Sequence, residues 1–215
     1  MSSDLVEITL LSLAVSGAAT LISLLIGLPI GTWLALTRFR SRHLVLNVVN
    51  TGMALPPVVA GLFIALILWR SGILGGLGLM YTPGAMVIAE VVIATPIVMG
   101  LTVAALGQLD PRLQLQLQGL GASRRQTVWW LWREARLPLL AAVMVAFGSV
   151  ISEVGAAMMV GGNIAHQTRV LTTAIVLETG RGEFGNAIVL GLVLLALAFM
   201  INGVLTWAQQ RGPRR

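Results

Sequence analysis

Five apolar stretches constrain this sequence more than any other feature. They cover residues 8–36, 44–69, 83–106, 138–160 and 187–207. A helix needs about 20 apolar residues to cross the hydrocarbon core of a bilayer, which is about 30 Å thick. Of the 215 residues, 57% are apolar and only 10% are charged, which leaves too little polar surface for a soluble domain of this length. We therefore expect an all-α integral membrane protein that is embedded in a lipid bilayer as one domain (residues 1–215). It should have about five transmembrane helices, and the sequence does not decide between five and six.

The arginines indicate how the chain is oriented in the membrane. All 14 basic residues are arginine, and eleven of them fall within residues 38–42, 107–137 and 211–215. The other three, Arg70, Arg169 and Arg181, lie in segments on the opposite side. Because arginine is enriched in cytoplasmic loops, this distribution predicts an outer N-terminus and an inner C-terminus. These arginines are topology signals, so no nucleic acid is expected as a partner.

A polar loop of residues 107–137 separates the third span from the fourth. It carries five arginines and a break at Gly121, and leucine and tryptophan recur along it. The loop is too polar to span a bilayer and too regular for a slack linker, so we expect a cytoplasmic docking surface. Glutamines alternate with leucines over residues 113–118, which is the period of a strand. A lone strand would have no sheet partner here, so we expect a helix.

Several positions within the spans predict irregular backbone or close packing. Pro56 and Pro57 cannot both sit in an unbroken helix. A break at that depth is tolerated only where protein buries it or where it lines a wet cavity, so the two prolines mark either a pathway segment or a packing kink. In the first span Gly27 and Gly31 have the four-residue spacing of closely packed membrane helices, and Pro29 predicts a kink.

Two carboxylates fall inside predicted spans. Insertion of a carboxylate at such a depth costs about 3 kcal/mol, so Glu153 should face the bundle interior, form a pair or be protonated. It is either a functional group or a structural one, hydrogen-bonded to a neighbouring helix end. Glu90 lies nearer the end of its span and is expected to be structural.

The sequence contains no recognisable catalytic motif. It has no cysteine, and its two histidines, His43 and His166, lie between spans. It lacks a His-Glu-x-x-His pair, a phosphate-binding glycine loop with lysine and a Gly-x-Ser-x-Gly elbow. We expect a chain that is not an enzyme and binds no metal or cofactor: a transport subunit powered by another protein. A channel and a membrane enzyme are the rival classes.

The polar loop resembles a known motif. Residues 115–125 read LQLQGLGASRR and precede Leu137-Pro138. They resemble the cytoplasmic loop of bacterial ABC importer permeases, in which Glu-Ala-Ala is followed four residues on by Gly and later by Leu-Pro. Here the Glu-Ala-Ala positions hold Leu115, Gln116 and Leu117, and Leu-Pro comes one helical turn later. In that family the loop is a coupling helix that docks into an ATPase. The resemblance implies that the docking residues are Gly119, Leu120, Gly121, Ala122, Ser123, Arg124 and Arg125.

A longer resemblance covers nearly the whole chain. Residues 55–61, 70–72 and 82–89, and above all 151–164 with 168–175, resemble permeases of tungstate importers within the tungstate, molybdate and sulfate group. This implies a type I ABC importer permease core in the bacterial inner membrane and a homodimer of this chain. It also implies a cytoplasmic ABC ATPase dimer, which binds and hydrolyses ATP with Mg, and an external oxyanion-binding protein. The cargo would be a tetrahedral oxyanion, tungstate first, imported by alternating access, with molybdate, sulfate or another small solute as alternatives.

The same resemblance implies where the substrate passes. Its path lies on the two-fold axis between two copies of the chain. Arg169, in the external loop of residues 161–186, either guides a dianion or pairs with Glu153 or Glu178. Met158 and Met159 form either an apolar gate or packing filler. The predicted pathway or gate residues are Pro56, Pro57, Glu153, Gly155, Met158, Met159, Asn163, Thr168 and Arg169.

Overall fold

The computed structural model describes residues 2–210, and this part of the chain is helical, with no strand in it. Arg211, Arg214 and Arg215, counted above among the inner arginines, lie outside the described residues. The elements are α1 (Ser2–Leu36), α2 (Arg42–Met53), α3 (Pro57–Leu68), the 3-10 helix η1 (Gly75–Leu77), α4 (Pro83–Gly107), α5 (Pro111–Gly119), α6 (Arg124–Glu134), α7 (Arg136–Ile151), α8 (Gly155–Gly161), α9 (Leu171–Gly180) and α10 (Phe184–Gln210).

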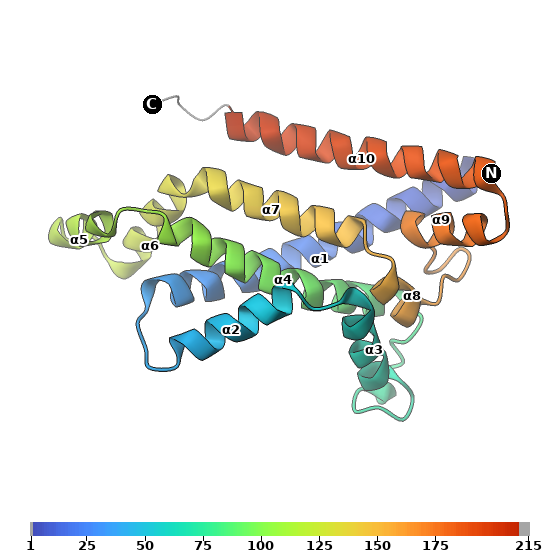
Figure 1. Cartoon of the computed structure of the whole chain (residues 1–215), viewed down its shortest axis with the longest axis horizontal. Coiled ribbons are helices and arrows are strands. Elements are labelled where there is room, and N and C mark those ends of the chain that lie inside the picture. Colours follow the sequence, from blue (N-terminus) through green and yellow to red (C-terminus); the bar gives the residue numbers. More distant parts are fainter. Residues whose placement is uncertain (1, 211–215) are drawn as a thin grey trace.

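Four helices, α1, α4, α7 and α10, run along the long axis of the molecule (Figure 1). α4 is the central one and contacts α1, α2, α3, α7 and α8. Its buried side includes Ala85, Ala89 and Ala94, each with 0% of its surface exposed. Since small side chains let helix backbones approach closely, α4 can serve as the axis on which the other helices pack. α5 and α6 lie at one end of the bundle, and α8 and α9 at the other.

The two glycines predicted to pack closely do so against α4. A Cβ added at Gly31 would lie 2.8 Å from the carbonyl oxygen of Met99 and 2.8 Å from Thr102 Cβ. One added at Gly27 would lie 2.7 Å from Val98 Cγ1. α1 remains a single helix of 35 residues through Pro29. The α1–α4 contact therefore depends on the absence of a side chain at these two positions.

Replacing Gly31 with alanine is expected to lower the free energy of unfolding by about 1–3 kcal/mol, because the new methyl group overpacks against backbone. Gly17 is the matched control, since a Cβ there meets nothing within 4 Å. Gly17→Ala should raise the stability of α1 by up to about 1 kcal/mol. Unfolding by dodecyl sulfate titration in detergent would measure both variants, and equal effects would contradict the packing argument.

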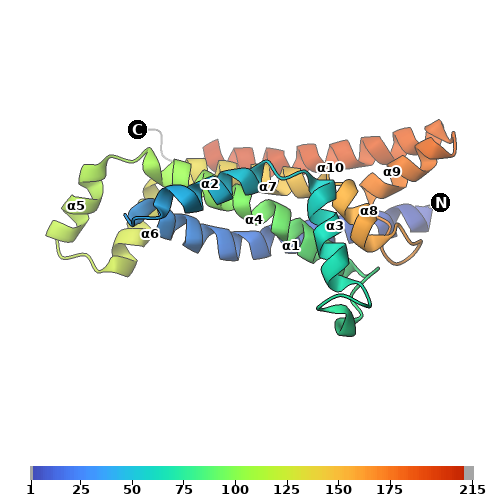
Figure 2. The ribbon, with the colours of Figure 1, turned by 60° about the horizontal axis from the view of Figure 1, so that its bottom comes forward.

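The second predicted span is broken, as the two prolines indicate, but the break is larger than a kink. α2 and α3 are each 12 residues long, and their axes differ by 100°. Pro56 is the N-cap of α3 and Pro57 is its first residue. The N–H of a first helical residue makes no hydrogen bond within the helix, so proline, which lacks that N–H, is tolerated there. α3 therefore leaves the long axis of the bundle and projects sideways (Figure 2). The break expected within residues 44–69 is therefore confirmed, with a separate helix on each side of it.

The fourth predicted span, residues 138–160, is also corrected. α7 begins two residues earlier than predicted and ends at Ile151, and α8 follows after a break at residues 152–154. α6 and α7 are bent against each other by 74°. Among the described residues three helices are long and apolar enough to cross a membrane, or up to five if each bent pair counts as one span. The predicted count of about five lies within that range.

The glutamine-leucine repeat forms α5, so the expectation of a helix there is confirmed. Within the predicted external loop of residues 161–186, a short helix, α9, also forms. α9 packs on α10 through Leu171, Ala174 and Leu190. Only 6% of the most apolar 18-residue segment of α10 is buried, so most of the apolar surface of this helix is open to lipid or to another protein.

Candidate functional site

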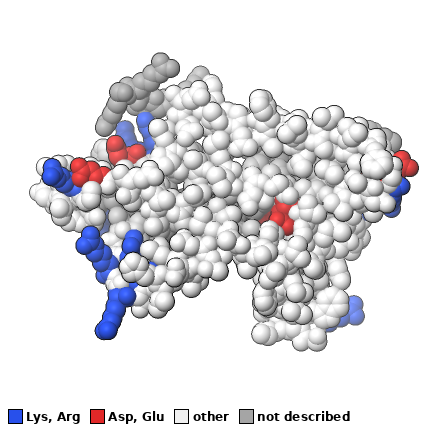
Figure 3. All heavy atoms as spheres, in the orientation of Figure 1, with Lys and Arg blue, Asp and Glu red and all other residues white. Residues whose placement is uncertain are grey.

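The predicted docking residues form the turn between α5 and α6, at one extreme of the molecule (Figure 2). Basic side chains gather at this end, whereas the middle of the face shown in Figure 3 carries almost no charge. An apolar cluster fixes the turn to the bundle. In it Leu113 and Leu117 of α5 pack on buried Leu106 of α4 and Leu131 of α6. The turn is therefore packed directly against α4.

Hydrogen bonds lock the conformation of the turn. Gly121 has φ +80°, in the left-handed region that only glycine occupies readily. Its N–H donates to the carbonyl of Gln118 (2.9 Å), and the N–H of Ala122 donates to the carbonyl of Leu117 (3.0 Å). This pair of bonds is the Schellman motif that ends a helix at a glycine. Leu120, next to the glycine, is left 84% exposed.

Both helices that flank the turn are capped by their own sequence. Ser123 is the N-cap of α6, and its hydroxyl accepts a hydrogen bond from Gln126 N while the Gln126 side chain accepts from Ser123 N. Asp110 caps α5, and Arg112 N donates to its Oδ1 at 2.8 Å. The seven predicted docking residues are thus contiguous and presented on a defined turn. Leu115, which stands at the first Glu-Ala-Ala position of the motif and was not counted among the docking residues, is 68% exposed on α5.

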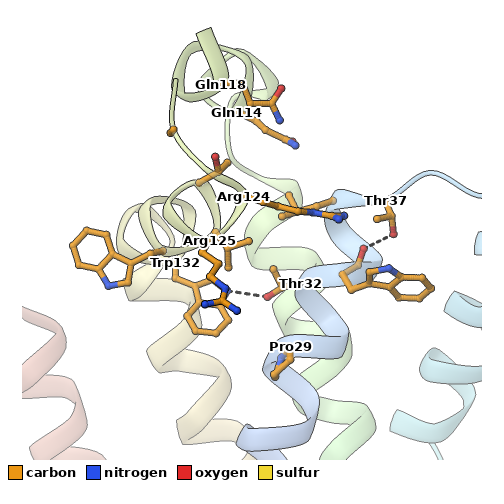
Figure 4. Close-up of a pocket in the computed structure, with 14 residues that line it drawn as sticks. Pro29, Thr32, Thr37, Gln114, Gln118, Arg124, Arg125 and Trp132 are labelled. Atoms are coloured by element: carbon orange, nitrogen blue, oxygen red, sulfur yellow. Dashed lines mark hydrogen bonds between the residues drawn. The ribbon is translucent and has the colours of Figure 1, made fainter. Parts of the chain in front are cut away.

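A cavity of about 1050 Å³ lies behind the turn, between α5, α6 and the end of α1 (Figure 4). Across it the Trp132 indole N–H donates to Thr32 Oγ1 at 2.8 Å and so ties α6 to α1. Arg124 and Arg125 line the cavity together with Gln114 and Gln118. Nothing local in the sequence points to this cavity, because its walls come from segments about a hundred residues apart.

At the opposite end, Glu153 lies in the break between α7 and α8 and is 9% exposed. Its Oε1 accepts a hydrogen bond from the N–H of Ala156 (2.9 Å), in the first turn of α8, and its carbonyl accepts one from Thr172 Oγ1 (2.8 Å). The carboxylate therefore satisfies a helix end, which is the structural alternative foreseen for it. A role in a pathway stays a prediction.

Arg169 does not take the acidic partners considered from the sequence. Its guanidinium donates to Asn163 Oδ1 (3.2 Å) and to the Asn163 carbonyl (3.3 Å). Within residues 2–210 no ion pair joins it to Glu153 or Glu178, and Glu178 pairs instead with Arg181 at 3.3 Å. Asp4 and Glu178 line the same small cavity as Arg169. Two carboxylates beside this guanidinium reduce its attraction for a dianion.

Thr168 is the buried centre of the loop between α8 and α9. It is 0% exposed, its hydroxyl donates to the Gly161 carbonyl (2.6 Å), and the same oxygen accepts from Ile164 N (3.0 Å). Ser12 of α1 accepts a hydrogen bond from Leu171 N (2.8 Å) and anchors the end of this loop. Asn163 and Thr168 therefore hold the loop in one conformation.

The other predicted pathway residues meet where α3 packs on α8. A Cβ at Gly155 would clash with Val58, which follows the proline pair, and one at Gly61 would lie 2.6 Å from the Ala156 Cα. Met158 and Met159 are each 38% exposed on α8. The nine predicted residues thus fall into two neighbouring groups, one at the α3–α8 contact and one in the loop beyond α8.

Two further titratable groups, Glu90 and His166, are not among the predicted site residues. Glu90 is buried in α4 with 3% exposed surface, and its Oε2 has no hydrogen-bond partner among the described residues. It is thus deeper in the protein than the sequence indicated. His166, in the loop after α8, meets Glu7 at 2.8 Å. The Glu7 carboxylate accepts a hydrogen bond from the imidazolium and raises the pKa of His166 above its ordinary value.

Comparison with known proteins places the chain among transport proteins. The profile of the family described as "Binding-protein-dependent transport system inner membrane component" matches residues 27–211. The probable anion ABC transporter permease protein of Haloferax volcanii is 37% identical over 98% of this chain and 93% of its own length. The tungstate uptake system permease protein TupB of Peptoclostridium acidaminophilum is 38% identical over 94% of this chain and 89% of its own length.

A solved structure supports the same fold. One chain of the methionine ABC transporter MetNI, in an inward-facing conformation, superposes with a TM-score of 0.81 and covers 100% of this chain and 98% of its own. The two sequences are 20% identical, so the likeness concerns the fold alone.

Proposed function

The chain belongs to the family of binding-protein-dependent transport system inner membrane components, and from that premise we propose that it is the permease subunit of an ATP-driven oxyanion importer. Tungstate is the proposed cargo. The family and the type I ABC importer permease fold expected from the sequence are both confirmed. The observation that carries the cargo is the 38% identity, over 94% of this chain, to a permease named for tungstate uptake.

Orientation follows from the arginines. The α5–α6 turn faces the cytoplasm and the loop between α8 and α9 faces outward, because basic residues concentrate on the inner side. A cytoplasmic ABC ATPase dimer binds the turn, with Leu120 as the exposed apolar contact. ATP and Mg bind to that partner, which carries out the hydrolysis. An external oxyanion-binding protein delivers the anion at the α8–α9 end.

Two copies of the chain enclose the path. One copy alone leaves α10 and the methionine face of α8 uncovered, and pairing two copies about a two-fold axis would cover such apolar surface. ATP binding draws the two docked turns together. The leucine cluster at Leu106 and Leu131 then passes that movement to α4, and the bundle exchanges inward for outward access.

The test is the ATPase activity of the complex reconstituted in lipid with its ATPase and binding protein. Tungstate, molybdate, sulfate and phosphate are each titrated separately. We expect hydrolysis to be stimulated by loaded binding protein, with tungstate acting at the lowest concentration. Preference for molybdate or sulfate would keep the importer and replace the cargo. Failure of the chain to associate with any ATPase would contradict the importer proposal and favour a channel.

A further inference from the structure

The cavity behind the docking turn has the chemistry of an anion site. Its lining includes two guanidinium groups, two amides and three threonine hydroxyls, and no carboxylate. Figure 4 shows Arg124 and Arg125 extending from α6 over the cavity toward α1, with Gln114 and Gln118 above them. Guanidinium groups bind phosphate oxygens bidentately, and amide N–H groups can complete the coordination of such a group.

The size of the cavity decides between two sources of phosphate. A free tetrahedral oxyanion would leave most of a 1050 Å³ space empty, whereas a phospholipid headgroup with its glycerol fills far more of it. The floor is also apolar, since Pro29, Trp33 and Leu36 of α1 form it. An anion site for a small hydrated ion has no use for such a floor.

An apolar track continues from this floor along α1. Leu25 and Leu21 lie one and two turns before Pro29, on the same side of the helix, and are 76% and 64% exposed. Ile22 borders them at 38% exposed. An acyl chain could lie on this track while its phosphate sits under the two arginines.

The cavity also lies at the depth that a headgroup occupies. Pro29 belongs to a helix that is long enough to cross the membrane, while the arginines belong to the polar loop outside it. Trp33, Trp129 and Trp132 line the space between, and tryptophan is enriched at membrane interfaces. Basic pockets at the cytoplasmic side of membrane helices bind anionic lipid headgroups. We propose that this cavity binds the phosphate headgroup of an anionic phospholipid of the inner leaflet through Arg124 and Arg125.

Native mass spectrometry of the purified full chain in detergent tests the lipid site without any ATPase. Its outcome therefore does not depend on whether the proposed importer function is correct. Phosphatidylglycerol and phosphatidylcholine with the same acyl chains are added at equal concentration. We expect phosphatidylglycerol to be retained more tightly than phosphatidylcholine. Arg124→Gln with Arg125→Gln should weaken phosphatidylglycerol binding by about thirtyfold, at about 1 kcal/mol per arginine. Arg40→Gln with Arg112→Gln removes the same charge outside the cavity and should change binding by less than about twofold.

A second pair of variants keeps the test open if the arginine variant does not fold. Gln118→Glu places a carboxylate in the cavity lining, and Gln116→Glu places one on the same helix outside it. Only the first should release phosphatidylglycerol. Equal retention by wild type and both lining variants would overturn the proposal. Displacement of the lipid by millimolar inorganic phosphate or tungstate, with these anions bound in its place, would also overturn it in favour of a free oxyanion.

Discussion

Replacement of Gly121 by valine is expected to abolish stimulation of the partner ATPase by loaded binding protein while the bundle stays folded. No atom lies within 4 Å of a Cβ at this position, so the effect is conformational and not steric crowding by a neighbour. At φ +80° a β-branched residue is strained by about 1–2 kcal/mol or more. The turn should then lose the hydrogen bond from Ala122 N to the Leu117 carbonyl and no longer present Leu120 in one position.

Two controls separate this effect from a general weakening of the loop. Gly121→Asn is tolerated in the left-handed region and should keep most of the stimulation. Gly107→Ala changes a helical glycine at the start of the polar loop, outside the docking residues, whose Cβ also meets nothing within 4 Å. ATPase stimulation in this variant should equal that of wild type. The measurements are the ATPase rates of reconstituted complexes and the co-purification of the ATPase with each variant. If the valine variant is stimulated like wild type, the conformation of this turn has no role in coupling to the ATPase.

The parts of this site that sequence reasoning predicted are those encoded locally. Gly121 and Ser123 specify a helix end and a helix start within three residues, so the turn can be inferred without knowledge of the rest of the fold. The proline pair at Pro56 and Pro57 likewise determines a break by its own stereochemistry. In the glutamine-leucine repeat the period favoured a strand, and the lack of a sheet partner correctly favoured a helix.

The parts that it missed depend on residues far apart or on the absence of a local signal. The hydrogen bond between Trp132 and Thr32 joins positions 100 residues apart, and no sequence pattern in either segment predicts it. The 100° angle between α2 and α3 depends on how α3 packs against α8. Arg169 was expected to seek an opposite charge, yet an amide six residues away satisfies it.

After Gly121→Val, the second large effect is expected from Thr168→Val, which should lower the free energy of unfolding by about 2–4 kcal/mol. Valine has nearly the shape of threonine, so the change removes hydrogen bonds without leaving a cavity. The N–H of Ile164 and the carbonyl of Gly161 would both lose the hydroxyl that now satisfies them in a buried site. Each buried polar group left unpaired costs about 1–3 kcal/mol.

Thr168→Ser supplies the matched comparison, because it keeps the hydroxyl and loses one methyl group, at a cost of about 1 kcal/mol. Thr179→Val makes the same chemical change as the test variant at an exposed site of α9 and should stay within about 0.5 kcal/mol of wild type. Dodecyl sulfate titration in detergent ranks the three variants. If valine is no worse than serine at position 168, the hydroxyl does not hold the loop. If valine is the most destabilising of the three, the Thr168 hydroxyl holds the loop of residues 161–170 in place, and we then expect gating at this end to come from movement of whole helices.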